Sequence, residues 1–329
     1  MDSVKQRYKF SQAIQEQLVN LRKLDNWHCI FGILYDYFVI AFAVTIFLVQ
    51  HWLYPISIIL IGSRQRALAT ILHEAAHLCI AKSRRWNQIV GTYLSGYLIL
   101  QEFDSYRDSH VKRHHAYLGH PENDPDYKYH IEQKLYEYKG CFEFFKEYIL
   151  KPLFLLKAAS YTWYLIKHRL LPNRLYVHNY IKMFSMWATI FVICSYFHVI
   201  YYLLILWFVP LLTTAALFGW FNELAEHYPL IGKHTNEMYM TRNRFSHWLE
   251  HFLFNTHNEN YHLIHHLQAT IPYWNLKKAH EIMCQDPVYA NLNENMGGIF
   301  ASKNRRIPSL IKRFMSEPTI NKQGQVQYE

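Results

Sequence analysis

The stretch Met183–Asn222, MFSMWATIFVICSYFHVIYYLLILWFVPLLTTAALFGWFN, contains no Asp, Glu, Lys or Arg in 40 residues. A helix that crosses a bilayer needs roughly 20 apolar residues at about 1.5 Å each, so this stretch has room for two helices. Phe197 and His198 form the expected turn, and Pro210 is expected to kink the second helix. The stretch therefore predicts a membrane hairpin, with spans at about 183–199 and 201–221.

A second apolar block runs from about Cys29 to Leu72 and divides at residues 50–52. Pro55 stands in the first turn of its second half, a position that proline tolerates. Asp36 lies in the first half, where an acid is either near the lipid headgroups or functional, and we expect it near the headgroups. The block predicts a second hairpin with spans at about 29–50 and 53–72, while the shorter apolar segment 89–100 is expected to be buried or interfacial.

Two hairpins return the chain twice to the side that it left, so the residues outside them share one side of the membrane. Those parts hold many Lys and Arg residues, whereas the two opposite turns hold none. By the positive-inside rule the shared side is cytoplasmic. We therefore predict an all-α integral membrane protein, with four transmembrane helices in two hairpins and a cytoplasmic helical cap. Its expected parts are a cytoplasmic N-terminal segment (1–28), a membrane domain (29–284) and a cytoplasmic C-terminal tail (285–329), so that both termini are cytoplasmic.

The bulk composition agrees with a membrane protein. Charged residues make up 18% of the chain, against about 25% in average proteins. The net charge of +9 is better explained by basic loops on an anionic cytoplasmic leaflet than by nucleic-acid binding. The five cysteines are scattered without a Cys-x-x-Cys pair, which indicates free thiols in a reducing compartment.

Three short runs of sequence hold eight histidines at one-turn spacings. His73 and His77 stand four residues apart, and such a pair lies on one helix face with side chains about 5–6 Å apart. Neutral imidazole is the commonest protein ligand for a transition metal, and eight buried imidazoles without a metal would leave many polar atoms unpaired. A metal site on the cytoplasmic side is therefore predicted. The three runs are His73-Glu74-Ala75-Ala76-His77, His110-Val111-Lys112-Arg113-His114-His115 and His262-Leu263-Ile264-His265-His266.

Two other classes of metal-binding protein, zinc proteases and metal transporters, could account for part of this pattern. The first run matches the His-Glu-x-x-His motif of zinc proteases, in which Glu74 would be the general base. A single zinc takes three protein ligands and a water, which would leave at least five clustered histidines without a role. A metal transporter would favour ionisable groups inside the spans, whereas the histidine runs lie outside the predicted spans.

The three runs resemble the histidine boxes of the integral-membrane fatty-acid desaturases and related hydroxylases, in order and in spacing. The resemblance covers Asp25 to Cys284, and two spans separate the second and third boxes. The acidic segment 119–126 and the context of the third box, 260–267, are similar to what that family carries, as are Pro272–Asn275 and Ala279–His280. The resemblance implies a di-iron centre held by histidines, with O2 as the oxidant.

The resemblance also implies a ninth ligand, His227, which follows the last predicted span. Glu223 lies one turn before it, where some relatives use Asn to hold a water. Second-shell bonds to Glu223, Asp108 and Asn260 are expected, and Asp104, Asp124, Glu226 and Glu259 are further carboxylates that could accept a ligand N–H. Beyond the metal centre we predict no catalytic residue and no other cofactor-binding residue. The predicted ligands are His73, His77, His110, His114, His115, His227, His262, His265 and His266.

The implied reaction introduces a double bond into the acyl chain of a lipid, acyl-CoA or acyl-carrier substrate. Hydroxylation of an acyl chain, or of a terpenoid or carotenoid, is the alternative, because placement of the substrate carbon to within about 1 Å decides between the outcomes. The chain shows no flavin or dinucleotide fingerprint, so a separate ferredoxin, cytochrome b5 or similar electron donor is expected. Residues 132–174 are predicted to form an amphipathic aromatic helix on the membrane or over the site.

Overall fold

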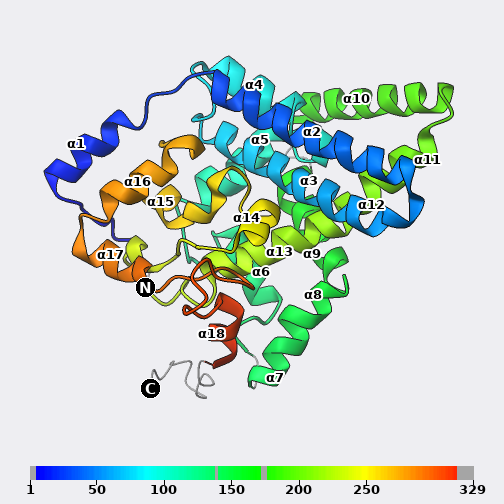
Figure 1. Ribbon diagram of the computed structural model, residues 1–329. Coiled ribbons are helices and arrows are strands. Elements are labelled where there is room, and N and C mark those ends of the chain that lie inside the picture. Colours follow the sequence, from blue (N-terminus) through cyan, green and yellow to red (C-terminus); the bar gives the residue numbers. More distant parts are fainter. Residues whose placement is uncertain (1–4, 138–139, 172–175, 317–329) are drawn as a thin grey trace. The chain divides into compact units, whose positions relative to one another are not determined.

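The computed structural model describes residues 5–137, 140–171 and 176–316, and these residues form helices and loops (Figure 1). Among them, extended pairing is limited to two isolated bridges, Gln6 with Asn236 and Ser246 with Ser302. The prediction of an all-α fold is therefore confirmed. Residues 317–329 of the predicted C-terminal tail lie outside the described residues.

The contacts between residues divide the chain into two compact units, and each unit combines segments that are distant in the sequence. The first unit comprises Met1–Lys23, Lys112–Lys157 and Trp220–Glu329, and the second comprises Leu24–Val111 and Ala158–Gly219. Helix α13 (Thr214–His227) begins in the second unit and ends in the first. The helices of the second unit are α2 (Trp27–Val49), α3 (Tyr54–Ala76), α4 (Arg84–Tyr93), α5 (Phe103–Ser109), α9 (Ala158–Leu165), α10 (Val177–Tyr196), α11 (Ile200–Leu203) and α12 (Val209–Leu212).

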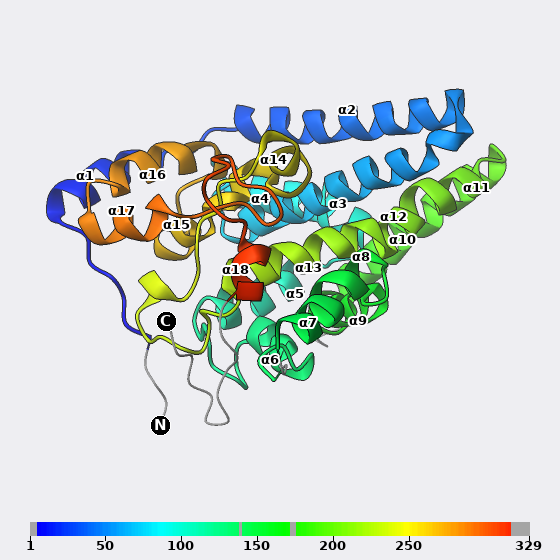
Figure 2. The same cartoon turned by 60° about the horizontal axis from the view of Figure 1, so that its bottom comes forward.

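Helices α2 and α3 form the first predicted hairpin and lie side by side in both views of the second unit (Figure 1, Figure 2). The break falls where it was expected, with a 3-10 turn at His51–Leu53 and Pro55 in the first turn of α3. One stripe of α2 is buried at helical spacing, whereas its other face exposes Phe31, Phe38 and Phe42. A large exposed apolar face of this kind marks a surface that contacts a membrane or another protein.

Asp36 is fully buried in this hairpin, where its Oδ1 lies 3.4 Å from Nη1 of Arg64. Arg64 also donates a hydrogen bond to Ser63. Asp36 is therefore paired inside the hairpin, and its expected position near the headgroups stays a prediction. A buried acid in an apolar helix requires such a partner, because an unpaired charge there is costly.

The second predicted hairpin also reverses where expected. Helix α10 ends at Tyr196, His198 is exposed with φ 57°, and α11 begins at Ile200. The second half of this helical hairpin is irregular. A π-helical turn covers Leu204–Phe208, and Pro210 lies in the first turn of α12. Proline lacks an N–H and crowds the preceding turn, which accounts for the irregularity.

Of the described helices, two are long and apolar enough to cross a membrane, Trp27–Val49 and the continuous helical stretch Ile200–His227. The other two predicted spans correspond to α3, of 23 residues, and α10, of 20 residues. The middle of α3 carries Arg64, Gln65 and Arg66, which lower its hydropathy. The four-span topology therefore stays a prediction.

The first unit has an aromatic core. Phe144 stacks on Tyr228, and the indole Nε1 of the buried Trp220 donates to the carbonyl of Tyr148 at 3.0 Å. Its helices, besides the end of α13, are α1 (Gln12–Asn20), α6 (Pro125–Glu132), α7 (Cys141–Phe144), α8 (Lys151–Leu153), α14 (Trp248–Phe254), α15 (His262–Leu267), α16 (Leu276–Met283), α17 (Pro287–Glu294) and α18 (Leu310–Ser316).

The expectation of one amphipathic aromatic helix over 132–174 is wrong. The described part of this range consists of short helical pieces, α7 to α9 with π-helical turns at Phe145–Leu150 and Ile166–Leu170. Lys134 and Leu155 have positive φ, which no continuous helix allows. The aromatic residues of this range differ in burial, since Phe144 is buried whereas Phe142 is exposed.

Candidate metal centre

In the second unit, three predicted ligands form a histidine trio, His73, His77 and His110. His73 and His77 lie at the end of α3, and His110 directly follows α5. The ring centroid of His73 lies 4.9 Å from that of His77 and 4.6 Å from that of His110. Two of the expected boxes therefore contribute side chains to one cluster within this unit.

Glu74 contacts a ring of the trio, and Arg107 bonds the backbone at the end of α3. The Nδ1 atom of His73 lies 3.2 Å from Oε1 of the buried Glu74, which also accepts a hydrogen bond from the thiol of Cys79. Arg107 donates to the carbonyl of Ala76 at the end of α3. A proton on Nδ1 of His73 leaves the Nε2 lone pair for a metal, which is the usual arrangement of a ligating histidine.

In the first unit, four further histidines form a histidine tetrad, in which one ring nitrogen of each lies within 4.8 Å of those of the others. All four side chains are buried. His262 and His266 come from the same face of α15, and His227 ends α13. The members of the tetrad are His114, His227, His262 and His266.

Backbone and carboxylate oxygens fix the orientation of two tetrad rings. Nδ1 of His114 lies 2.9 Å from Oδ1 of Asp124, a fully buried residue that also caps α6. Nδ1 of His227 faces the carbonyl oxygen of Met240 at 3.5 Å. Both contacts place a proton on Nδ1 and leave Nε2 as the ligand atom.

A buried ion pair lies beside the tetrad. Nη1 of Arg244 is 3.1 Å from Oε1 of Glu226 and also donates to the carbonyl of Asn222. The other carboxylate oxygen of Glu226 lies 3.6 Å from Nε2 of His262. Arg244 therefore orients the carboxylate of Glu226, whose second oxygen faces a ring nitrogen of the tetrad.

The remaining two ligands predicted for the first unit, His115 and His265, form a pair with Nε2 atoms 3.0 Å apart. The ring of His115 stacks on that of His266, with centroids 4.3 Å apart and planes at 10°. All six histidines that were predicted as ligands in this unit are thus within one group of rings.

The donor set of the tetrad fits a transition metal. Nε2 of His262 lies 3.1 Å from Nε2 of His227 and 3.0 Å from Nε2 of His266. A ring nitrogen carries either one proton or one lone pair, so hydrogen bonds alone satisfy this cluster poorly. Burial, together with the neighbouring imidazoles, lowers the pKa of His266 well below its usual value, which keeps the ring neutral. Neutral imidazoles converging on one point are the donor set of a bound metal cation.

Asn243 positions α15 and was not predicted from the sequence. Its buried Oδ1 accepts from the backbone N–H groups of Leu263 and Ile264, and its Nδ2 donates to Tyr289 and Asn293. These bonds satisfy two N–H groups in the first turn of α15 and so set the direction of its histidine face. A single Asn in a loop gives no sequence signal for this role.

The residues that were expected to hydrogen-bond the ligand histidines have different surroundings. Asp108 accepts a hydrogen bond from the hydroxyl of Tyr176 at 2.7 Å, and Asn260 exchanges hydrogen bonds with the backbone of Arg244. Glu223 lies one turn before His227 on α13. Of the further carboxylates named above, Asp124 contacts the predicted ligand His114 and Glu226 approaches the predicted ligand His262, whereas Asp104 and Glu259 accept from Asn179 and Asn222.

Comparisons with known proteins agree with this site. The sequence model of the family described as "Fatty acid desaturase" matches residues 50–296. The chain is also similar to a protein of Bradyrhizobium elkanii named "Dihydrorhizobitoxine desaturase", with 37% identity over 315 residues, which cover 92% of this chain and 88% of the relative. The match includes every predicted ligand, and an oxidoreductase is therefore indicated in place of the zinc protease that the first histidine run would also allow. The chain belongs to the fatty acid desaturase family.

Proposed function

We propose that the chain is a membrane-bound, O2-dependent di-iron desaturase that introduces a double bond into the acyl chain of a lipid, acyl-CoA or acyl-carrier substrate. The observation that carries the proposal is the buried tetrad of imidazole nitrogens with its outer nitrogens held by Asp124 and the Met240 carbonyl. The family is one of desaturases, which supports the same class of reaction.

The nine histidines predicted as ligands are proposed to hold two iron ions. When bound, iron supplies the activation of O2 and the removal of hydrogen from unactivated carbon, which protein side chains cannot perform. The tetrad is proposed to hold one ion, and the trio to contribute ligands to the other.

The protein's own part is to orient the ligands and to exclude water. Asp124 and the carbonyl of Met240 keep the ligand lone pairs in place, so little reorganisation is needed when a metal binds. The ion pair of Glu226 and Arg244 supplies a fixed charge beside His262. Burial of the tetrad keeps bulk solvent away from the reacting atoms.

We further propose four membrane spans with both termini and the site on the cytoplasmic side. Two described helices support membrane association by length and composition. Two electrons are proposed to arrive from a separate ferredoxin, cytochrome b5 or similar donor, because the chain shows no flavin or dinucleotide fingerprint.

Two alternative outcomes concern the substrate and the product. The same site could hydroxylate an acyl chain or a terpenoid, since substrate placement decides between loss of a second hydrogen and oxygen insertion. The relative from Bradyrhizobium elkanii is named for dihydrorhizobitoxine, and its 37% identity over 92% of this chain makes that compound a second candidate substrate.

The test is to express the full chain and its His265→Ala variant, measure bound metal, and profile lipids and metabolites in both cultures. We expect about two irons per chain and a new double bond in one compound class, which disappears with His265→Ala. Dihydrorhizobitoxine is assayed in parallel with acyl substrates. One zinc and no iron would overturn the proposal, as would a variant that keeps its activity.

A further inference from the structure

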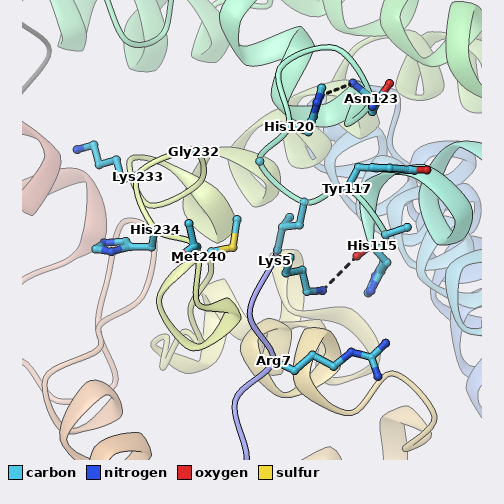
Figure 3. Close-up of a pocket in the computed structure, with 14 residues that line it drawn as sticks. Lys5, Arg7, His115, Tyr117, His120, Asn123, Gly232, Lys233, His234 and Met240 are labelled. Carbon is cyan, nitrogen blue, oxygen red and sulfur yellow. Dashed lines mark hydrogen bonds between the residues drawn. The ribbon is translucent and has the colours of Figure 1, made fainter. Parts of the chain in front are cut away.

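A cavity of about 490 Å³ opens beside His115 in the first unit (Figure 3). Its walls come from the N-terminal residues 5–7, the loop 115–123 and the segment 232–235, with Met240 completing one side. Cavities of roughly 300–1,000 Å³ are typical of small-molecule sites. The cavity therefore has the size to receive part of a small organic molecule.

The charges around the cavity have one sign. Lys5, Arg7 and Lys233 line it, and among the described residues no carboxylate does. Lys5 is paired, since its Nζ lies 3.2 Å from Oε2 of Glu237 and donates to the carbonyl of His115. Arg7 is exposed, and within the described part of the chain its guanidinium has no carboxylate partner. The cavity thus offers cationic donors to an anion.

Backbone contacts hold the cationic segment in place. The N–H of Gln6 donates to the carbonyl of Thr235 at 2.8 Å, and the N–H of Glu237 donates to the carbonyl of Gln6 at 3.1 Å. Lys5 and Arg7 flank Gln6, so both side chains are presented from a backbone that is paired to the opposite wall. A site with a fixed backbone loses less entropy when it binds a ligand.

Two glycines allow the walls to meet closely. Gly119 and Gly232 have φ of 79° and 81°, values that favour glycine. A Cβ at Gly119 would lie 2.8 Å from Cε of Met240 and 3.1 Å from the backbone nitrogen of Gly232. The shape of the cavity therefore depends on backbone that carries no side chain at these two points.

The cavity also borders the ligand group described above. His115 lines the cavity, and its Nε2 atom lies 3.0 Å from Nε2 of His265. Leu118 and Met240 add apolar surface to the lining. One wall thus carries charge, another carries a predicted metal ligand, and apolar groups lie in the same lining, which is the pattern needed for a molecule with an anionic end and a carbon chain.

We propose that this cavity binds the anionic end group of the substrate, a carboxylate or a phosphate, with Arg7 as its cationic partner. This proposal rests on the proposed function. Guanidinium groups bind carboxylate and phosphate in a bidentate manner, and charge-assisted hydrogen bonds of this kind are stronger than neutral ones. Holding one end of the molecule fixes which carbon of its chain lies near His115, and so contributes to the position of oxidation.

The test measures binding directly on the purified full-length protein, by calorimetry in a non-ionic detergent below the micelle concentration of the probes. The probes are decanoate, decyl phosphate and decanol. We expect the two anions to bind at least about tenfold more tightly than decanol, and Arg7→Glu to remove that preference. Lys277→Glu on α16 is the matched control, because this exposed lysine lies outside the cavity lining.

Further arms identify the source of the anion. Displacement of decanoate by coenzyme A in the parent, but not in Arg7→Glu, would assign the cavity to a carrier phosphate, and displacement by a short free carboxylic acid alone would assign it to a free acid. Equal binding of decanol and decanoate would overturn the proposal, as would equal losses in Arg7→Glu and Lys277→Glu.

Two more outcomes distinguish this proposal from an electron-donor surface and from the di-iron function itself. If Arg7→Glu slows reduction by an acidic ferredoxin while decanoate binding is unchanged, the cavity is a donor surface and the proposal is wrong. Iron is measured in every sample, so a chain that lacks iron yet binds decanoate through Arg7 would uphold the cavity and refute the di-iron function.

Discussion

The histidine tetrad and the histidine trio differ in how firmly their rings are held before any metal binds. The tetrad is buried throughout, and two of its rings have an oxygen facing Nδ1. In the trio, His73 and His77 are partly exposed, and Glu74 is the carboxylate that faces His73. The tetrad rings are therefore the more firmly held of the two clusters before a metal binds.

The largest expected effect comes from removing a tetrad ring. His266→Ala should lower iron content from about two to about one per chain and reduce turnover by more than about 100-fold, because it removes one of the four nitrogens proposed to hold an ion. Metal analysis and product formation measure the two effects. His28→Ala, at an exposed histidine paired with Asp25, is the control and should keep both values. Full iron content in His266→Ala would remove the tetrad from the metal site.

Acid should act on the first unit through a histidine outside the ligand set. Burial lowers the pKa of His130 to about 4, with smaller contributions from Asp126, which raises it, and His114, which lowers it. The unfolded chain therefore binds one more proton than the folded chain between pH 6.5 and about 4. Stability falls as pH falls through this window, by about 3 kcal/mol in total.

Replacing this ring tests that estimate. Both ring nitrogens of His130 are buried without a hydrogen-bond partner among the described residues, so His130→Leu should keep the packing against Trp220 and remove the titration. Thermal unfolding of metal-free protein at pH 7 and pH 4.5 compares parent and variant. The parent should lose more stability than His130→Leu. An equal loss in both proteins would show that other groups account for the acid sensitivity.

Asp124 tests whether outer contacts explain the firmness of the tetrad. Asp124→Asn keeps an oxygen for Nδ1 of His114 but loses the charge, and its amide would face the N–H of Gly119. We expect iron affinity to fall by about 10- to 100-fold, as for other partners of ligating histidines. Competition with a chelator measures the affinity.

A matched control exists on another helix. Asp286 caps α17 as Asp124 caps α6, with bonds to two backbone N–H groups and a proline in the first turn, and its hydrogen bonds within the described residues come from no histidine. Asp286→Asn should change stability without changing iron affinity. Equal losses of iron affinity in the two variants would show that loss of the cap, and not loss of the histidine contact, lowers the affinity of Asp124→Asn.

The sequence predicted the helix breaks and the grouping of histidines on helix faces because both have local causes. The breaks at 50–52 and 197–198 follow from polar residues between apolar runs, and the histidine faces follow from helical spacing. The partners of the rings depend on contacts that are distant in sequence. Asn243 reaches α15 from 20 residues away, so no local pattern could reveal it. Asp124 was one of several candidate acids, and only packing distinguishes it from Asp104.

Residues 132–174 show the opposite case. Their aromatic periodicity predicted one helix, but positive φ at Lys134 and Leu155 divides the chain there. Neither position carries Gly or Pro, the residues that usually mark such breaks in a sequence. Tertiary packing of Phe144 and Tyr148 in the first unit therefore outweighs local helix preference.

The smallest effect is expected at Glu74, the carboxylate of the trio. Glu74→Gln keeps an oxygen at Oε1 for the Nδ1–H of His73, whose side chain is 15% exposed and so already partly solvated. Iron affinity and turnover should therefore change by less than about tenfold, below the effect of Asp124→Asn. Side-by-side chelator competition on both variants measures the difference. A zinc protease that used Glu74 as its general base would instead lose its reaction completely, so retained oxidation in Glu74→Gln separates the two chemistries at this residue. An effect larger than that of Asp124→Asn would reverse the comparison, because it would make the trio the more tightly held of the two clusters.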